Sequence, residues 1–175
     1  SDQKGLVNHR EADTVAQLIK RIRTHYHQRI VIITPYKRQK KIIKTKLNEL
    51  DELDPMLNVD TVDSFQGDEA PIVIYCTTRT RYCTDFFSDY ARINVAMSRT
   101  NNMLFIVASS KYLRKYTSKK PDHVLPALAD YIEQNGIVLK SVNIWDDSLD
   151  WQYNPIALEH RKENNTSPLS NTQQH

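Results

Sequence analysis

The residues whose types and spacing could do chemistry lie in three short segments. The first holds Arg92 and Arg99, which stand seven residues apart and would share one face of a helix. An arginine carries a permanent charge and a planar fork of N–H donors, which can stabilise the charge that develops during phosphoryl transfer. The alternative is a pair of surface salt bridges. The spacing therefore allows a phosphate-facing arginine without requiring one.

The second segment, residues 63–71, has the sequence DSFQGDEAP. It combines carboxylates and an amide with Gly67, the only glycine between Gly5 and Gly136. Glycine allows backbone conformations that other residues resist. The third segment, residues 34–36, directly follows an apolar run. Both segments could line a ligand site, and an ordinary turn is the alternative for residues 63–71.

A phosphate-binding loop of the common type is absent from the sequence. The pattern G-x-x-x-x-G-K-[ST] needs a lysine directly after a glycine, and none of the three glycines is followed by one. The six histidines do not pair with cysteines or carboxylates at metal-ligand spacing, apart from the weak pair His25 and His27. We therefore expect ordinary surface histidines and no metal site.

Two helices and a strand are predicted in the first third of the chain. Asn8 and Glu11 have the spacing of a capping box, so a helix should run from about residue 10 to 24. The apolar run at residues 30–33 favours a strand buried on both faces. A second helix is expected over residues 37–51, where lysines form a basic stripe on one side. A solvated helix face is the favoured interpretation of this stripe, and a phosphate-tracking surface is the alternative.

The remaining elements predict an α/β fold. Further strands are expected at residues 57–62, 72–76 and 103–108, with a last one at 137–139. Residues 79–89 have no clear period and are expected to form a loop. A short helix with Ile93, Ala96 and Met97 facing inward and a helix around residues 125–132 complete the pattern. Alternating strands and helices imply a mainly parallel sheet with helices on both faces.

Ligands of such sheets bind beyond the carboxyl ends of the strands. Residues 34–36 and 63–69 follow predicted strands and therefore qualify. The helix over residues 92–99 precedes a strand and could line the same region.

Composition limits the class of protein. A chain of 175 residues with 39% apolar residues can form a single core, so we expect one domain over residues 1–150. The polar residues 160–175 should form a disordered tail. Cys76 and Cys83 favour free thiols in a reducing compartment, and no apolar run approaches the roughly 20 residues of a membrane span. These features indicate a soluble intracellular protein, cytoplasmic or nuclear, without a membrane partner. The net charge of +3 neither requires nor opposes a nucleic-acid partner.

Four segments in order, NHREA, VIITPYKRQ, VDTVDSFQGDEAPIVIYC and ARINVAMSR, resemble the motifs of one helicase group. The chain is similar to the superfamily 1B helicases related to the nonsense-mediated decay RNA helicase, over about residues 5–140. Met97, Thr100 and Asn101 depart from the usual family residues, away from the proposed chemistry.

The resemblance implies the second of two RecA-like motor domains of the P-loop NTPase type, in which the first domain holds the phosphate loop. ATP with Mg²⁺ would bind between the domains, and the first domain would supply most of the magnesium ligands. By motif position Glu69 lies near the nucleotide and Arg99 contacts the γ-phosphate. Gln66, Gly67 and Arg92 match neighbouring positions and would support this site.

The resemblance also implies a path for nucleic acid. Thr34, Pro35, Tyr36 and Ser64 match segments that approach the backbone of single-stranded RNA or DNA, where contacts position the strand without reading sequence. Asn8, with Glu11, matches the first family element, but the capping box favours a structural role for both.

The implied function is ATP-driven movement along single-stranded RNA or DNA, 5′ to 3′, by the whole protein together with its first RecA-like domain. We expect the isolated chain to have no measurable ATPase activity, because its nucleotide site would be half built. The alternative is a helicase-like scaffold that binds nucleic acid or protein without unwinding. A fused nuclease domain is a third possibility, and the motifs do not distinguish RNA from DNA.

Overall fold

The computed structural model describes residues 6–65, 69–80, 94, 97–115 and 124–138. All of them belong to one compact unit, Ser1–Trp145. The tail expected over residues 160–175 lies outside the described residues and stays a prediction.

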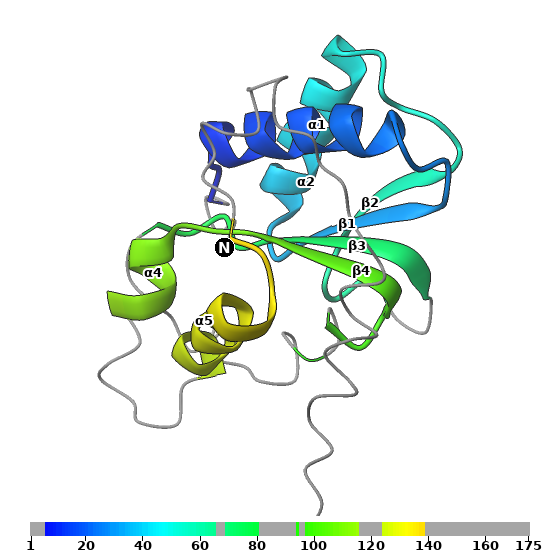
Figure 1. Ribbon diagram of the computed structural model, residues 1–175. Helices are drawn as coiled ribbons and strands as arrows, with labels where there is room; N and C mark the ends of the chain where they lie inside the picture. The colour runs from blue at the N-terminus through cyan, green and yellow to red at the C-terminus, as the bar shows by residue number, and fades with distance from the viewer. Residues whose placement is uncertain (1–5, 66–68, 81–93, 95–96, 116–123, 139–175) are drawn as a thin grey trace, which may run out of the picture. The chain divides into compact units, whose positions relative to one another are not determined.

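Four parallel strands form the described sheet (Figure 1). They are β1 (Ile30–Thr34), β2 (Leu57–Thr61), β3 (Ala70–Cys76) and β4 (Thr100–Val107), in the order β2-β1-β3-β4. All five residues of β1 are buried, as expected for a strand covered on both faces. Because the strands are parallel, their amino ends share one edge of the sheet and their carboxyl ends share the opposite edge.

Helices cover both faces of the sheet. Figure 1 shows α1 (His9–Arg23) and α2 (Lys37–Glu49) on one side, and α4 (Ser110–Lys115) and α5 (Val124–Asn135) on the other. The buried residues of α4 and α5 pack against Ile106 of β4. The predicted α/β class, with a parallel sheet between helices, is therefore confirmed.

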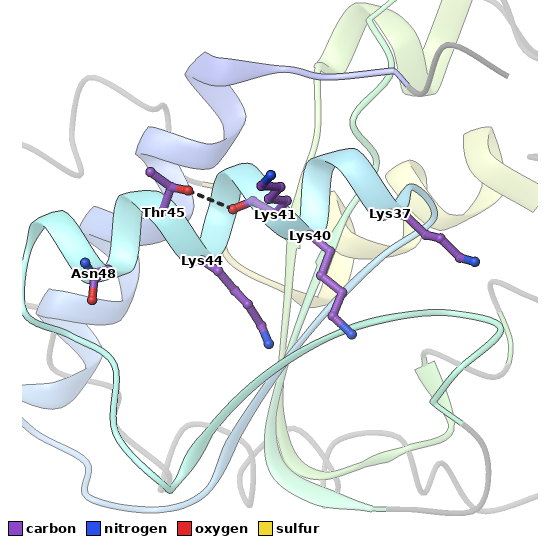
Figure 2. A pocket seen from close by; sticks show the side chains of 6 residues that line it. All are labelled: Lys37, Lys40, Lys41, Lys44, Thr45 and Asn48. Atoms are coloured by element: carbon purple, nitrogen blue, oxygen red, sulfur yellow. Dashed lines mark hydrogen bonds between the residues drawn. The ribbon is translucent and has the colours of Figure 1, made fainter. Parts of the chain in front are cut away.

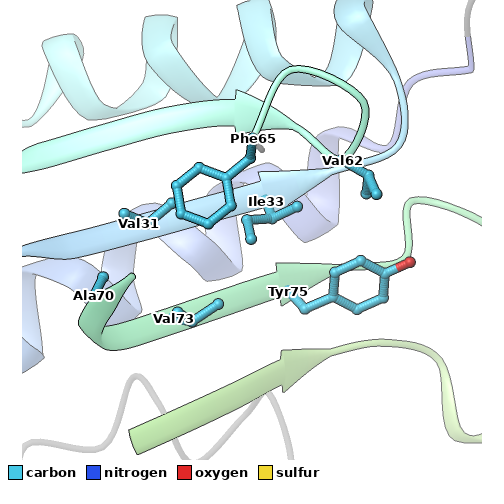
Figure 3. Close-up of a cluster of buried hydrophobic side chains, with 7 residues drawn as sticks. All are labelled: Val31, Ile33, Val62, Phe65, Ala70, Val73 and Tyr75. Atoms are coloured by element: carbon cyan, nitrogen blue, oxygen red, sulfur yellow. The ribbon is translucent and has the colours of Figure 1, made fainter. Parts of the chain in front are cut away.

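One face of the sheet is closed by Phe65, which follows β2 and is 3% exposed. Figure 3 shows its ring lying over Val31 of β1. The cluster around it comprises Val31, Ile33, Val62, Phe65, Ala70, Val73 and Tyr75. The packing of Phe65 brings the chain back across the sheet from the carboxyl end of β2. Ala70, the first residue of β3, belongs to the same cluster.

The start of α1 confirms half of the predicted capping box. The Asn8 side chain accepts a hydrogen bond from the Glu11 N–H at 3.1 Å, as an N-cap residue does. In a complete box the Glu11 carboxylate would return to the Asn8 N–H. That N–H instead donates to Gln39, and Glu11 turns inward toward Thr77. A tertiary contact has replaced the local one.

The strand expected at residues 137–139 is not observed at its first two positions. Ile137 and Val138 form no strand and are 76% and 61% exposed, so this apolar pair gains neither burial nor a ladder partner among the described strands. The helix α4 was not predicted, because its six residues are too few to show a helical period.

In the expected short helix, Asn94 and Met97 are helical, while Ile93 and Ala96 lie outside the described residues. Residues 79 and 80 belong to neither helix nor strand, and residues 81–89 of the expected loop are outside the description.

Within the described ranges, no helix is long and apolar enough to cross a membrane. Cys76 is a free and fully buried thiol, and burial raises its pKa well above the ordinary value. The other cysteine, Cys83, lies outside the described residues.

Candidate functional site

The amino-edge pair consists of Glu69 and Arg99, which lie side by side. Glu69 directly precedes β3 and Arg99 directly precedes β4, and these strands are parallel neighbours. The Ala70 N–H donates to the Arg99 carbonyl at 3.0 Å, so the two segments are joined at the point where both strands begin. The Arg29 guanidinium donates to the Glu69 carbonyl at 3.1 Å and fixes the backbone there.

The Arg99 side chain has an unsatisfied donor. The residue is half-buried, and its Nε is buried without a hydrogen-bond partner in the part of the chain that the structure describes. A buried donor without an acceptor costs about 1–3 kcal/mol, and more when the group is charged. An oxyanion would satisfy this donor, so Arg99 fits the phosphate-facing role that its spacing allowed. The neighbouring Glu69 is exposed to solvent.

A second group of residues lies at the opposite edge of the sheet. We call it the carboxyl-edge cluster; its members are Thr34, Pro35, Tyr36, Ser64, Thr78 and Arg79. Thr34 is the last residue of β1, and Pro35 and Tyr36 follow it. Ser64 follows β2, and Thr78 and Arg79 follow β3. The Val62 N–H donates to the Thr34 carbonyl at 3.3 Å, which holds the segments after β1 and β2 together.

Within the cluster, Tyr36 and Arg79 contact each other. The Arg79 Nε donates to the Tyr36 hydroxyl, and the guanidinium carbon lies 5.6 Å from the centre of the tyrosine ring. Both residues are half-buried. A cation held beside an aromatic ring offers a charge for a phosphate and a face for a base, which are the two contacts that single strands use.

Ser64 and Thr34 differ in accessibility. Ser64 is exposed, and its hydroxyl accepts a hydrogen bond from the Thr61 hydroxyl at 2.8 Å. Thr34 is fully buried, and its hydroxyl lies 3.0 Å from the Thr78 hydroxyl. The Thr34 side chain is therefore bonded inside the protein, and it supports the carboxyl-edge cluster through its contact with Thr78.

Thr78 adopts an unusual backbone conformation. Its φ of 63° lies in the left-handed region, which is a genuine outlier for a β-branched residue. Such a conformation persists only where the surroundings determine it. Here the Asn8 side chain donates to the Thr78 carbonyl at 3.2 Å, and the Thr34 hydroxyl engages its side chain. These contacts fix the backbone immediately before Arg79.

Glu11 lies beneath the same segment. Its carboxylate accepts a hydrogen bond from the Thr77 hydroxyl at 3.3 Å, and the residue is 6% exposed. Burial raises the pKa of Glu11 to about 8, and backbone hydrogen bonds from Thr78 and Thr77 oppose this rise only in part. A carboxyl group with this pKa is largely protonated at neutral pH and acts as a neutral part of the core.

The two groups lie at opposite edges of the sheet. A seven-residue strand such as β3 spans about 20 Å, which is the scale of the separation between the amino-edge pair and the carboxyl-edge cluster. The expectation that the segment of Arg99 lines the region beyond the carboxyl ends is therefore wrong. The cause is connectivity, because Arg99 precedes its strand instead of following it. The other proposed nucleotide-site residues, Gln66, Gly67 and Arg92, lie outside the described residues.

Three residues at these sites carried no prediction of a role. Arg79 follows β3 as Tyr36 follows β1, so the carboxyl-end rule could have found it. Gln39 ends the segment VIITPYKRQ that carries the family resemblance, so the motif could have marked it. Thr78 gave no signal, because its backbone conformation is visible only in three dimensions.

The described residues do not build a metal centre. Within the ranges that the structure covers, no three His, Cys, Asp or Glu side chains gather closely enough to hold an ion. At the amino edge, Glu69 is a single exposed carboxylate and belongs to no such group among the described residues.

Comparison with known proteins finds similarity to several helicases. The chain is 32% identical over 116 residues to the RNA helicase Mov10l1 of Mus musculus, which is 62% of this chain and 9% of that protein. It is 31% identical over 108 residues to an uncharacterized ATP-dependent helicase of Methanocaldococcus jannaschii, covering 62% of this chain and 16% of that protein. The chain is 30% identical over 115 residues to the DNA polymerase alpha-associated DNA helicase A of Saccharomyces cerevisiae, which covers 62% of this chain and 16% of that protein. The chain thus spans a small fraction of the length of these relatives.

Residues 1–111 match the protein family described as AAA domain, which agrees with the expected P-loop NTPase type of fold. Since this match covers more than half of the 175 residues, the chain belongs to the AAA domain family and is similar to a segment of several helicases.

Proposed function

We propose that this chain is the second of two RecA-like motor domains in a superfamily 1B helicase similar to the nonsense-mediated decay RNA helicase. The whole protein would couple ATP hydrolysis to 5′ to 3′ movement along single-stranded RNA or DNA. The observation that carries the proposal is the buried, unsatisfied Nε of Arg99 beside Glu69 at one edge of the sheet.

In this proposal the amino-edge pair faces ATP, and the first RecA-like domain of the same polypeptide holds the rest of the nucleotide. That domain supplies the phosphate loop and most of the magnesium ligands. Arg99 donates to the γ-phosphate and stabilises the charge that develops on it. Glu69 contributes a carboxylate near the nucleotide, supported by Gln66, Gly67 and Arg92.

The carboxyl-edge cluster holds the nucleic-acid backbone. Tyr36 and Arg79 offer a ring face and a charge, and Ser64 offers an exposed hydroxyl. Pro35 and the backbone of Thr34 shape the same edge, while the Thr34 side chain stays engaged with Thr78. None of these contacts distinguishes bases, which suits a motor that must move along any sequence.

β3 connects the two edges. It begins directly after Glu69, ends shortly before Arg79, and its last five residues are buried. Closure of the domain on ATP at the amino edge would therefore move the carboxyl edge as part of one rigid body. Opening after hydrolysis would return it, and alternating grip would produce steps along the strand.

The test is ATP hydrolysis by the whole protein that contains this chain, with and without single-stranded RNA or DNA. We expect turnover that a single strand stimulates, and unwinding of duplexes that carry a 5′ overhang in preference to a 3′ overhang. The stronger stimulant identifies the substrate. Absence of turnover with every strand would contradict the motor and support a helicase-like scaffold.

A further inference from the structure

One face of α2 borders an open hollow of about 480 Å³ (Figure 2). The hollow is lined by Lys37, Lys40, Lys41, Lys44, Thr45 and Asn48. We call this set the α2 basic face. Figure 2 shows that the side chains of Lys37, Lys40 and Lys44 extend to the same side of the helix.

Only one of the four lysines directly contacts a carboxylate within the described part of the chain. Lys40 donates to the Asp60 carboxylate at 2.8 Å. Burial of Asp60 acts to raise its pKa, but hydrogen bonds from Lys40 and the Thr61 N–H outweigh it and hold that pKa below the ordinary value. Asp60 therefore stays charged and forms an ion pair with Lys40. Lys37, Lys41 and Lys44 are exposed and make no direct ion-pair contact with the described residues, although the charge of Lys44 also lowers the pKa of Asp60.

The stability of α2 does not explain these charges. The first turn has no acidic residue, and the N-cap Tyr36 makes no side-chain capping bond. A positive charge at a helix N-terminus opposes the helix dipole. The pairs Lys37–Lys41 and Lys40–Lys44 also place like charges four residues apart, which is unfavourable.

Lys46 of the same helix shows the contrast. It contacts Asp13 of α1 at 3.3 Å and Glu49 at 3.1 Å, so it bridges carboxylates on two helices. A lysine that serves the fold on this helix thus contacts carboxylates directly, whereas Lys37 and Lys41 have no acidic partner among the described residues and Lys44 acts on Asp60 only through its charge.

The chemistry of the hollow fits phosphate groups. Its lining is cationic or neutral and polar, with no acidic and no aromatic side chain. Lys37 and Lys44 are separated by about 10 Å along the helix, so the row can meet more than one phosphate of a strand. Lys37 follows Tyr36 directly, which makes the row continuous with the carboxyl-edge cluster.

We propose that the α2 basic face is a second nucleic-acid contact that binds backbone phosphates of the strand leaving the carboxyl-edge cluster. The choice of nucleic acid over another polyanion rests on the proposed function. Binding there is independent of sequence, depends strongly on salt, and does not need ATP.

The experiment compares this chain with its Lys41→Gln/Lys44→Gln variant, using a labelled single-stranded oligonucleotide over a series of salt concentrations. We expect weaker binding, and a slope of log affinity against log salt that is shallower by about 1.4, since each phosphate contact on a single strand contributes about 0.7. The matched control is Lys20→Gln/Lys111→Gln, which removes two exposed lysines from α1 and α4 and should leave affinity and slope unchanged.

Denaturant unfolding of the variant guards against a folding defect. Because like charges are removed, the variant should be at least as stable as the parent chain. Lys41→Arg/Lys44→Arg should retain binding, since the charge remains. Unchanged affinity and slope in the glutamine variant would overturn the proposal. An equal loss of binding to polyglutamate would also overturn it, because the hollow would then suit an acidic protein partner.

Failure of the motor proposal gives a different result. If the whole protein shows no strand-stimulated ATP hydrolysis while lysine-dependent binding persists, the result supports the nucleic-acid contact of the α2 basic face and contradicts the motor proposal. If the motor stands, the glutamine variant of the whole protein should need more strand for half-maximal stimulation, with the maximal turnover unchanged.

Discussion

Asn8 and Gln39 exchange two hydrogen bonds that join the start of α1 to the first turns of α2. The Asn8 N–H donates to the Gln39 side-chain oxygen at 2.8 Å, and the Gln39 amide donates to the Asn8 carbonyl at 3.0 Å. The Asn8 side chain also donates to the Thr78 carbonyl at 3.2 Å. Three segments far apart in the sequence are thereby fixed beside the carboxyl-edge cluster.

Replacement of Gln39 by alanine should destabilise the chain by about 2–4 kcal/mol. Gln39 is fully buried, so its loss leaves the Asn8 N–H unsatisfied and also opens a cavity. Urea denaturation of the chain measures the effect. The matched control is Gln134→Ala, an exposed position of α5, which should change stability by less than about 0.5 kcal/mol. A similar small change for Gln39→Ala would show that the exchange is not structural.

Thr34→Val tests the hydroxyl contact beneath the carboxyl-edge cluster. Valine has a similar shape but cannot bond to the hydroxyl of Thr78, a residue that is 1% exposed. The expected cost is about 1–3 kcal/mol in the free energy of unfolding, because a buried hydroxyl loses its partner. Thr45→Val provides the comparison, since its hydroxyl bonds to the Lys41 carbonyl at an exposed site. Equal effects of the two substitutions would argue against a special role for Thr34.

The sequence predicted the elements well wherever burial followed a simple period. The apolar run that became β1 and the helical face of α1 needed only local pattern, and both formed within two residues of the expected bounds. Glu11 shows the limit of that reasoning. Its spacing to Asn8 predicted a local capping contact, whereas its carboxylate is used by Thr77, which is 66 positions away.

The pH dependence of stability should carry a signature of Glu11. Its pKa is about 8 in the fold, against 4.5 as the ordinary value. Because the folded pKa is raised, the stabilisation is complete below about pH 4.5, declines as pH rises, and is lost as pH passes about 8. The decline is at most about 1.4 kcal/mol per pH unit.

Glu11→Gln keeps a neutral side chain of the same shape at every pH. Unfolding measured from about pH 4.5 to above about pH 8 should therefore show that the variant loses less stability than the parent chain as pH rises. Glu49→Gln, at an exposed position, should retain the decline of the parent. Parallel pH profiles for the parent and Glu11→Gln would contradict a protonated, buried Glu11.

The candidate sites were harder to predict than the elements. The resemblance assigned Glu69 and Arg99 to one nucleotide site, and the two residues lie at the same edge of the sheet. Their position at the amino ends of β3 and β4 depended on the parallel pairing of these two strands, which local pattern does not specify. The contact between Tyr36 and Arg79 required the long-range pairing of β1 with β3, which local pattern cannot specify.

The most direct test of the account is ATP hydrolysis by the whole protein carrying Arg99→Ala, measured with a saturating single strand. We predict that turnover falls by about a thousand-fold or more, while strand affinity changes little, because the carboxyl-edge cluster lies about 20 Å away. Arg10→Ala, at an exposed position of α1, should retain full turnover. Undiminished turnover in Arg99→Ala would contradict the claim that the amino-edge pair faces the nucleotide.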